Sequence, residues 1–221
     1  MQPAPWPVGL LFGVALAVLI TLVGPLLLFN PAFTAVLQDR HEVAEAFGTS
    51  PAEVGRVTGE ILVDLYTDGA FDAAFDGEPP LLNERERSHM HDVAVLVRLL
   101  AGVVLLALIV AVISGFWLRA EPRRQGRIML LSAAAIGAVA VVLAVAFAVA
   151  FEPAFLAFHT LFFPPGTYLF EAGSKLITLF PQGFWFDASL AAGAAIVFSA
   201  LVVTAIGLWR RREPVATVEP A

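Results

Sequence analysis

Residues 93–118 read VAVLVRLLAGVVLLALIVAVISGFWL, a run in which Arg98 is the only charged side chain. A helix rises about 1.5 Å per residue and a bilayer's hydrocarbon core is about 30 Å thick, so about 20 apolar residues cross it. A soluble helix of this length usually keeps a polar face, which this run lacks. The stretch therefore predicts a membrane-spanning helix that tilts or projects past the hydrocarbon.

Three further apolar blocks of similar length occupy residues 8–29, 128–150 and 188–209. The chain is 59% apolar and 14% charged, whereas about a quarter of residues are charged in soluble domains. We expect the first block to be retained, because it is too long for a secretory signal and lacks preceding basic residues and a small-residue cleavage site. The predicted fold class is an all-α membrane protein with four transmembrane helices.

Basic side chains predict the orientation of these spans. They gather in the link between the second and third spans and after the fourth, as Arg119, Arg123, Arg124, Arg127, Arg210, Arg211 and Arg212. The positive-inside rule places both segments, and hence both termini, in the cytoplasm. The expected organisation is spans at 1–29, 93–118, 128–150 and 188–209, outer segments at 30–92 and 151–187, a cytoplasmic link at 119–127 and a cytoplasmic tail at 210–221.

The two outer segments differ in character. Segment 30–92 is strongly acidic, which argues against nucleic acid as a partner. Helical patterning at 33–47 and 51–75, with Ser50 as an N-cap, predicts an extracytoplasmic helical cap of two or three short helices. Segment 151–187 is rich in aromatic rings and in prolines that forbid one continuous helix, so we expect an aromatic outer loop at the headgroup level.

Histidines mark the residues that could carry chemistry. His89 and Asp92 are three residues apart and share a helix face, so we expect Asp92 to orient the His89 ring. His159 lies among aromatic residues, where an imidazole requires a partner or a function. Two other interpretations remain open: structural, interfacial histidines, or a metal-dependent hydrolase with His89, His91, Asp92 and His159 as ligands. No cysteine, phosphate loop, G-x-S-x-G or H-E-x-x-H motif is present, and we predict no cofactor.

Three stretches together resemble the lipoprotein intramolecular transacylase family of bacterial membrane proteins. They are NERERSHMHDV at 83–93, FHTLFF at 158–163 and LITLFPQGFWFD at 176–187. Their order and separation match the family, as does the layout of four spans with a large outer segment. The resemblance therefore covers nearly the whole chain.

The resemblance implies an enzyme of the bacterial cell membrane whose site lies at the outer face, with lipoproteins and membrane lipids as partners. Its reaction would move an acyl chain from the glycerol sn-2 oxygen of a lipoprotein's lipidated N-terminal cysteine to that cysteine's α-amine, giving the lyso form. It implies His89 and His159 as the catalytic pair. Arg85 and Glu86 from the first motif, and Tyr168 where the family usually has Trp, would be supporting residues.

This chemistry suits two imidazoles. An α-amine with a pKa of about 7.7–8.0 must lose a proton before it attacks an ester, and an imidazole of pKa about 6.5 is a suitable base. We therefore hypothesise that His159 is the base and that His89, oriented by Asp92, is the acid or oxyanion stabiliser. A non-enzymatic membrane scaffold that docks partners through acidic segment 30–92 is the alternative from a different class.

Overall fold

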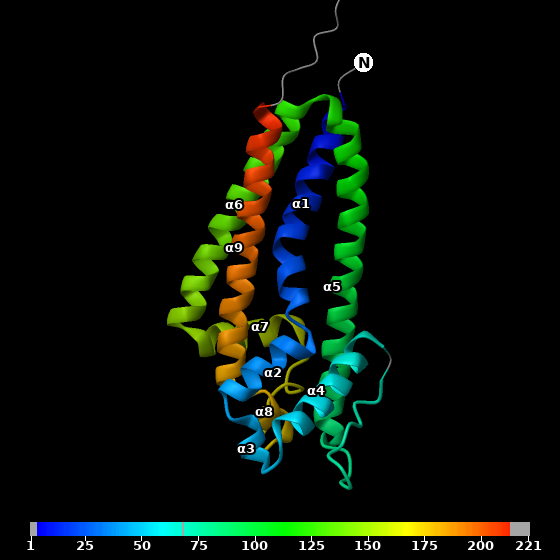
Figure 1. Cartoon of the computed structure of the whole chain (residues 1–221), viewed down its shortest axis with the longest axis vertical. Coiled ribbons are helices and arrows are strands. Elements are labelled where there is room, and N and C mark those ends of the chain that lie inside the picture. The colour runs from blue at the N-terminus through cyan, green and yellow to red at the C-terminus, as the bar shows by residue number, and fades with distance from the viewer. Residues whose placement is uncertain (1–3, 68, 213–221) are drawn as a thin grey trace, which may run out of the picture. The chain divides into compact units, whose positions relative to one another are not determined.

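The computed structural model describes residues 4–67 and 69–212, and within them the chain forms helices and no strand. Four helices are long and apolar enough to cross a membrane, and they are the long helices of Figure 1. They are α1 (Trp6–Leu27), α5 (Glu84–Trp117) with the 3-10 helix η1 (Leu118–Ala120), α6 (Pro122–Val149) and α9 (Gln182–Arg212). The predicted all-α membrane fold with four transmembrane helices is confirmed.

The long helices extend beyond the apolar blocks predicted from the sequence. α5 begins at Glu84, well before the run at 93–118, and α9 begins at Gln182, inside the segment predicted as a loop. A helix need not end where its apolar residues end, because polar residues can continue it outside the hydrocarbon. As a result, His89 lies on the same continuous helix as the apolar run.

The chain divides into two compact units. The first unit comprises Met1–Pro25, Gly102–Leu143 and Gly193–Ala221, and the second comprises Leu26–Ala101 and Ala144–Ala192. Helices α1, α5, α6 and α9 contribute residues to both units.

Small residues bring the helices of the first unit close together. Ala15 of α1 packs with Ala107 and Ala111 of α5 in one buried cluster. A Cβ built on Gly126 of α6 would lie 2.4 Å from the carbonyl oxygen of Gly207 of α9. Because membrane helices gain little from burying apolar surface against each other, such close backbone contact is a usual source of their packing energy.

The second unit contains the shorter helices, which Figure 1 shows gathered together. They are α2 (Pro31–Arg40), α3 (Val43–Phe47), α4 (Pro51–Tyr66), α7 (Phe151–Phe162) and α8 (Lys175–Leu179). Val57, Leu82 and Leu179 are almost completely buried in one hydrophobic core that α2, α3, α4 and α8 share with the starts of α5 and α9. The predicted set of two or three short helices in segment 30–92 corresponds to α2, α3 and α4.

Helix α4 starts as predicted and ends earlier. Ser50 caps its first turn, since its side chain accepts a backbone hydrogen bond three residues on. The helix stops at Tyr66 and not at residue 75. The Asp64 side chain instead accepts the N–H of Phe71 at 2.8 Å, and Phe71 has a left-handed backbone, with a φ of 53°. This turn lets the chain fold back and bury the Phe71 ring, which favours ending the helix.

Prolines divide segment 151–187 as expected. Pro153 lies in the first turn of α7, Pro164 follows its end, and Pro181 directly precedes α9. Each position tolerates a missing N–H, whereas a helix interior does not. The division leaves His159 in the last turn of α7.

Candidate active site

Two histidines from distant parts of the sequence lie side by side in the second unit. His89 comes from the start of α5 and His159 from the end of α7. Their ring centroids are 6.1 Å apart and the ring planes differ by 24°, so the rings are stacked. The structure therefore brings together the two residues that the sequence singled out.

His89 occupies an apolar site. The residue is 6% exposed, and the rings of Phe163 and Phe170 pack edge-on against its imidazole at centroid distances of 5.0 and 5.5 Å. Its Nδ1 is buried and has no hydrogen-bond partner among the described residues. Buried polar atoms almost always have a partner, so an unpartnered nitrogen here is available to a ligand.

The predicted contact between Asp92 and the His89 ring is not made. The Nδ1 of His89 has no partner because its ring turns toward α7 and stacks on His159 instead of lying along its own helix. The ring of His91 packs edge-on against Phe71, at a centroid distance of 5.0 Å. Across residues 4–67 and 69–212, no three His, Cys, Asp or Glu side chains form a group that could hold a metal ion. The alternative ligand set is therefore not assembled.

His159 is held in a defined tautomer. Its Nδ1 lies 2.8 Å from the carbonyl oxygen of Phe155, one turn earlier in α7. A carbonyl only accepts, so Nδ1 carries the hydrogen and Nε2 keeps a lone pair. The Tyr168 ring lies beside the imidazole, with centroids 5.3 Å apart, and its hydroxyl is 3.4 Å from Oγ1 of Thr160. Tyr168, predicted as a supporting residue, thus lies beside the half-buried ring of His159.

Glu86 is a fully buried carboxylate that connects two helix starts. Its Oε2 accepts the N–H of Asn83 at 2.9 Å, before α5. Its Oε1 accepts the hydroxyl of Ser174 at 2.5 Å and the N–H of Leu176 at 3.2 Å, at the start of α8. Negative charge is favoured at helix N-termini, where backbone N–H groups lack partners. His89 follows one turn later on α5.

Arg85 ties the loop after α7 to the same helix. Its Nη2 donates to the carbonyl of Gly166 at 2.9 Å, and its guanidinium lies 5.7 Å from the ring centroid of Phe170. Phe170 in turn contacts His89. Phe170 and Ser174 were not predicted as site residues, because no local motif links them to residues so far away in the chain.

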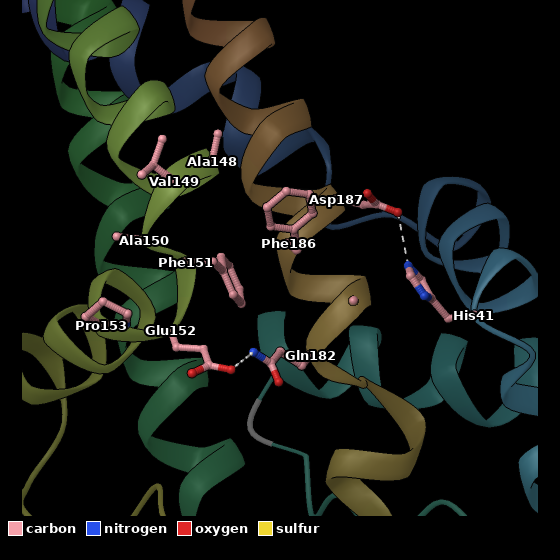
Figure 2. Close-up of a pocket in the computed structure, with 11 residues that line it drawn as sticks. His41, Ala148, Val149, Ala150, Phe151, Glu152, Pro153, Gln182, Phe186 and Asp187 are labelled. Carbon is pink, nitrogen blue, oxygen red and sulfur yellow. Dashed lines mark hydrogen bonds and ion pairs between the residues drawn. The ribbon is translucent and has the colours of Figure 1, made fainter.

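A cavity of about 530 Å³ lies near the first turn of α7, and neither His89 nor His159 lines it. Figure 2 shows its residues: apolar side chains from 148–153, with polar pairs on two sides. His41 Nε2 lies 3.0 Å from Asp187 Oδ2, and Gln182 Nε2 donates to Glu152 Oε1 at 3.0 Å.

A row of rings on α7 leads from this cavity to the histidine pair. Phe151 lines the cavity, and its ring centroid is 5.3 Å from that of Phe155. The Phe155 centroid is in turn 4.3 Å from that of His159. The i, i+4 spacing of these residues places all three rings on one face of the helix.

The fold and the ring pair together describe an integral membrane protein with a candidate two-histidine site. A family model, Lipoprotein intramolecular transacylase Lit, matches residues 8–185, and this chain belongs to that family. It is accordingly an acyltransferase that acts on lipoproteins.

Solved structures share the fold. The chain resembles the membrane integral lipoprotein intramolecular transacylase Lit from Bacillus cereus with a TM-score of 0.77 and 16% identity, over 92% of this chain and 94% of that one. Two structures of the same protein with a substituted histidine match with TM-scores of 0.74 and 16% identity, covering 92% of this chain and 90% and 91% of theirs. At this identity the likeness concerns the fold. A comparison with curated protein sequences gave no match.

Proposed function

We propose that this protein moves the sn-2 acyl chain of the diacylglyceryl group on a lipoprotein's N-terminal cysteine to the α-amine of that cysteine, and that His89 and His159 catalyse the transfer. The stacked imidazole pair, one ring buried with an unpartnered nitrogen, is the observation that carries the proposal. Ester and amine belong to one substrate, so proximity supplies much of the rate. An acyl-enzyme is then unnecessary, which suits a chain without cysteine.

His159 is suited to the role of general base. Its Nδ1–H bond to the carbonyl of Phe155 leaves Nε2 as the proton acceptor. As the amine nitrogen attacks the ester carbon, a C–N bond forms and the nitrogen gives a proton to Nε2. Collapse of the tetrahedral intermediate breaks the C–O bond, and that proton passes to the glycerol oxygen. The products are an amide and a free sn-2 hydroxyl, so atoms and charge balance.

His89 is suited to stabilise the oxyanion of the tetrahedral intermediate. An N–H donor fixed in an apolar site acts strongly on developing charge, because water does not screen it. The rings of Phe163 and Phe170 enclose the imidazole and keep water away. Glu86 and Arg85 act as positioning residues, since both tie the start of α5 to the loop that carries these rings.

We infer that the site faces the outer leaflet of the bacterial cell membrane, with both termini in the cytoplasm. The cationic link at 119–127 and the arginines that end α9 support this orientation under the positive-inside rule. The lipidated cysteine of a lipoprotein lies at that leaflet, within reach of a site built beside the spans.

The test is conversion of a diacylglyceryl lipoprotein to its lyso form by His89→Ala and His159→Gln variants, read by mass spectrometry of the N-terminal lipopeptide. Glutamine at 159 does not take a proton at neutral pH, so loss of the base should lower the rate by about 10²–10⁴-fold. Alanine at 89 removes the N–H donor, which a glutamine amide would keep, and should lower the rate by about 10²–10³-fold.

His91→Gln is the matched control, because His91 lies two residues from His89 and packs on Phe71, outside the pair. It should transfer within about twofold of the parent rate, as expected for a residue that makes no contact with the reacting groups. Wild-type rates in both His89 and His159 variants, with unchanged thermal transitions, would refute the proposal.

A further inference from the structure

Four arginines of the first unit line one cavity of about 510 Å³. Arg123, Arg124 and Arg127 come from the first two turns of α6, and Arg211 comes from the last turn of α9. Within the described residues, the lining of this arginine cavity consists of these side chains alone. Like charges gathered in one space repel each other, and a bound anion removes that repulsion.

Three of the four guanidinium groups have no hydrogen-bonding or charged partner among the described residues. Arg124 Nη1 donates to Glu121 Oε2 at 3.1 Å, which neutralises it. In the part of the chain that the structure describes, no hydrogen bond or ion pair engages Arg123, Arg127 or Arg211. The cavity thus holds more positive charge than neighbouring described side chains compensate.

Other arginines in the same region have structural partners. Arg119 donates to the carbonyl of Phe116 at 2.9 Å, and its guanidinium lies 3.6 Å from the centroid of that residue's ring. Arg210 donates from Nε to Oε1 of Gln125 at 2.7 Å. Of the arginines in this region that have no such partner among the described residues, Arg123, Arg127 and Arg211 line the cavity and Arg212 does not.

The backbone forces this convergence. A Cβ built on Gly126 would lie 2.4 Å from the carbonyl oxygen of Gly207 and 2.6 Å from Cγ of Arg211. Glycine at this crossing therefore brings Arg211 against the start of α6. Glu121, directly before α6, already accepts from Arg124 and from the N–H of Ala4, so its carboxylate does not compensate the other three arginines. Guanidinium groups favour an anion as their ligand.

We propose that the arginine cavity binds a phosphate group, for which an anionic phospholipid headgroup is the source that a membrane supplies. Guanidinium groups match phosphate oxygens with paired hydrogen bonds, and basic pockets between membrane helices bind anionic headgroups. The site is independent of the transacylase reaction, since none of its residues contacts His89 or His159.

The experiment measures lipid binding to the full-length protein by native mass spectrometry, with dioleoylphosphatidylglycerol against dioleoylphosphatidylcholine. Wild-type protein should prefer phosphatidylglycerol. Arg211→Gln should weaken that binding by about fivefold, and a triple change of Arg123, Arg127 and Arg211 to Gln by on the order of 100-fold. Arg212→Gln is the control, because it removes the same charge one residue later without touching the cavity, and it should change binding by less than about twofold.

A second arm adds inorganic phosphate to protein held in phosphatidylcholine alone. Stabilisation by phosphate that Arg211→Gln abolishes, with no added effect of phosphatidylglycerol, would keep the cavity as a phosphate site and identify soluble phosphate as its source. Equal losses of phosphatidylglycerol binding in Arg211→Gln and Arg212→Gln would overturn the proposal. So would a wild-type protein that neither prefers phosphatidylglycerol to phosphatidylcholine nor is stabilised by inorganic phosphate. Both variants should keep the wild-type thermal transition in phosphatidylcholine.

Discussion

Glu86→Gln tests whether one buried carboxylate holds the candidate active site together. Its three partners, Asn83, Ser174 and Leu176, all donate to it, which is the arrangement an ionised carboxylate requires. A glutamine oxygen can still accept from Ser174 and Leu176, but its NH₂ then faces the N–H of Asn83. A buried donor left unpaired costs about 1–3 kcal/mol, and two charge-assisted bonds become neutral ones, about half as strong. We expect the free energy of unfolding to fall by about 2–5 kcal/mol.

The same change should lower the rate of transfer in protein that remains folded. His89 lies one turn after Glu86, so a loosened start of α5 moves that ring relative to His159. Misplacement of a reacting group by about 1 Å can cost about 10²-fold in rate. The assay is lipopeptide mass spectrometry well below the unfolding temperature, with kcat expressed per folded protein and KM measured separately.

Glu84→Gln is the control, because it removes the same charge from the exposed side of the same turn. It should leave both unfolding and kcat close to wild type. A Glu86→Gln variant that unfolds and transfers like the wild-type protein would show that this carboxylate neither stabilises nor positions the site. A lower yield of folded protein with an unchanged kcat would limit Glu86 to a structural role.

Two further predictions concern glycines at close contacts. Gly126→Ala should lower the free energy of unfolding by about 1–3 kcal/mol in a denaturant titration, because the added Cβ meets the carbonyl of Gly207. Gly102→Ala is the control: the space around Gly102 is open, so this change should be neutral or stabilising by about 0.5–1 kcal/mol. Gly183→Ala should be destabilising because its Cβ lies 2.5 Å from Cε1 of His41, and a His41→Ala background should abolish the loss. An undiminished loss in the double variant would contradict that explanation.

The membrane fold could be predicted because it depends on a local quantity, the length of each apolar run. The run at 93–118 specifies a span whatever its neighbours do. His89 could be placed on a helix face, but the residue where α5 begins could not be predicted, because apolar length says nothing about how far a helix continues in polar residues. A signal was nevertheless present: Asn83 and Glu86 form the N-x-x-E spacing of a capping box, and their side chains bond to each other's backbone N–H.

The site was harder to predict, because it is made by contacts between distant segments. Sharing a helix face allowed Asp92 to meet His89 but did not determine which way the ring turns, and packing against α7 turned it away. Glu86 lies in the charged sequence ERER at 84–87, where solvent exposure is the ordinary expectation. Its burial depends on Ser174, far along the chain, so no local pattern reveals it.

The candidate site is built from helix ends, and this explains how a chain of apolar helices can position polar chemistry. Within a helix, backbone groups are paired, but at its ends they need partners from elsewhere. Glu86 supplies them to the starts of α5 and α8, one turn before His89. In α7 the carbonyl of Phe155, one turn before His159, fixes the tautomer of that ring, so His159 keeps its proton-accepting nitrogen only while the end of α7 remains helical. The two rings meet where these ends converge, beside the apolar run of α5 and not within it, because charge and unpaired backbone cost least there.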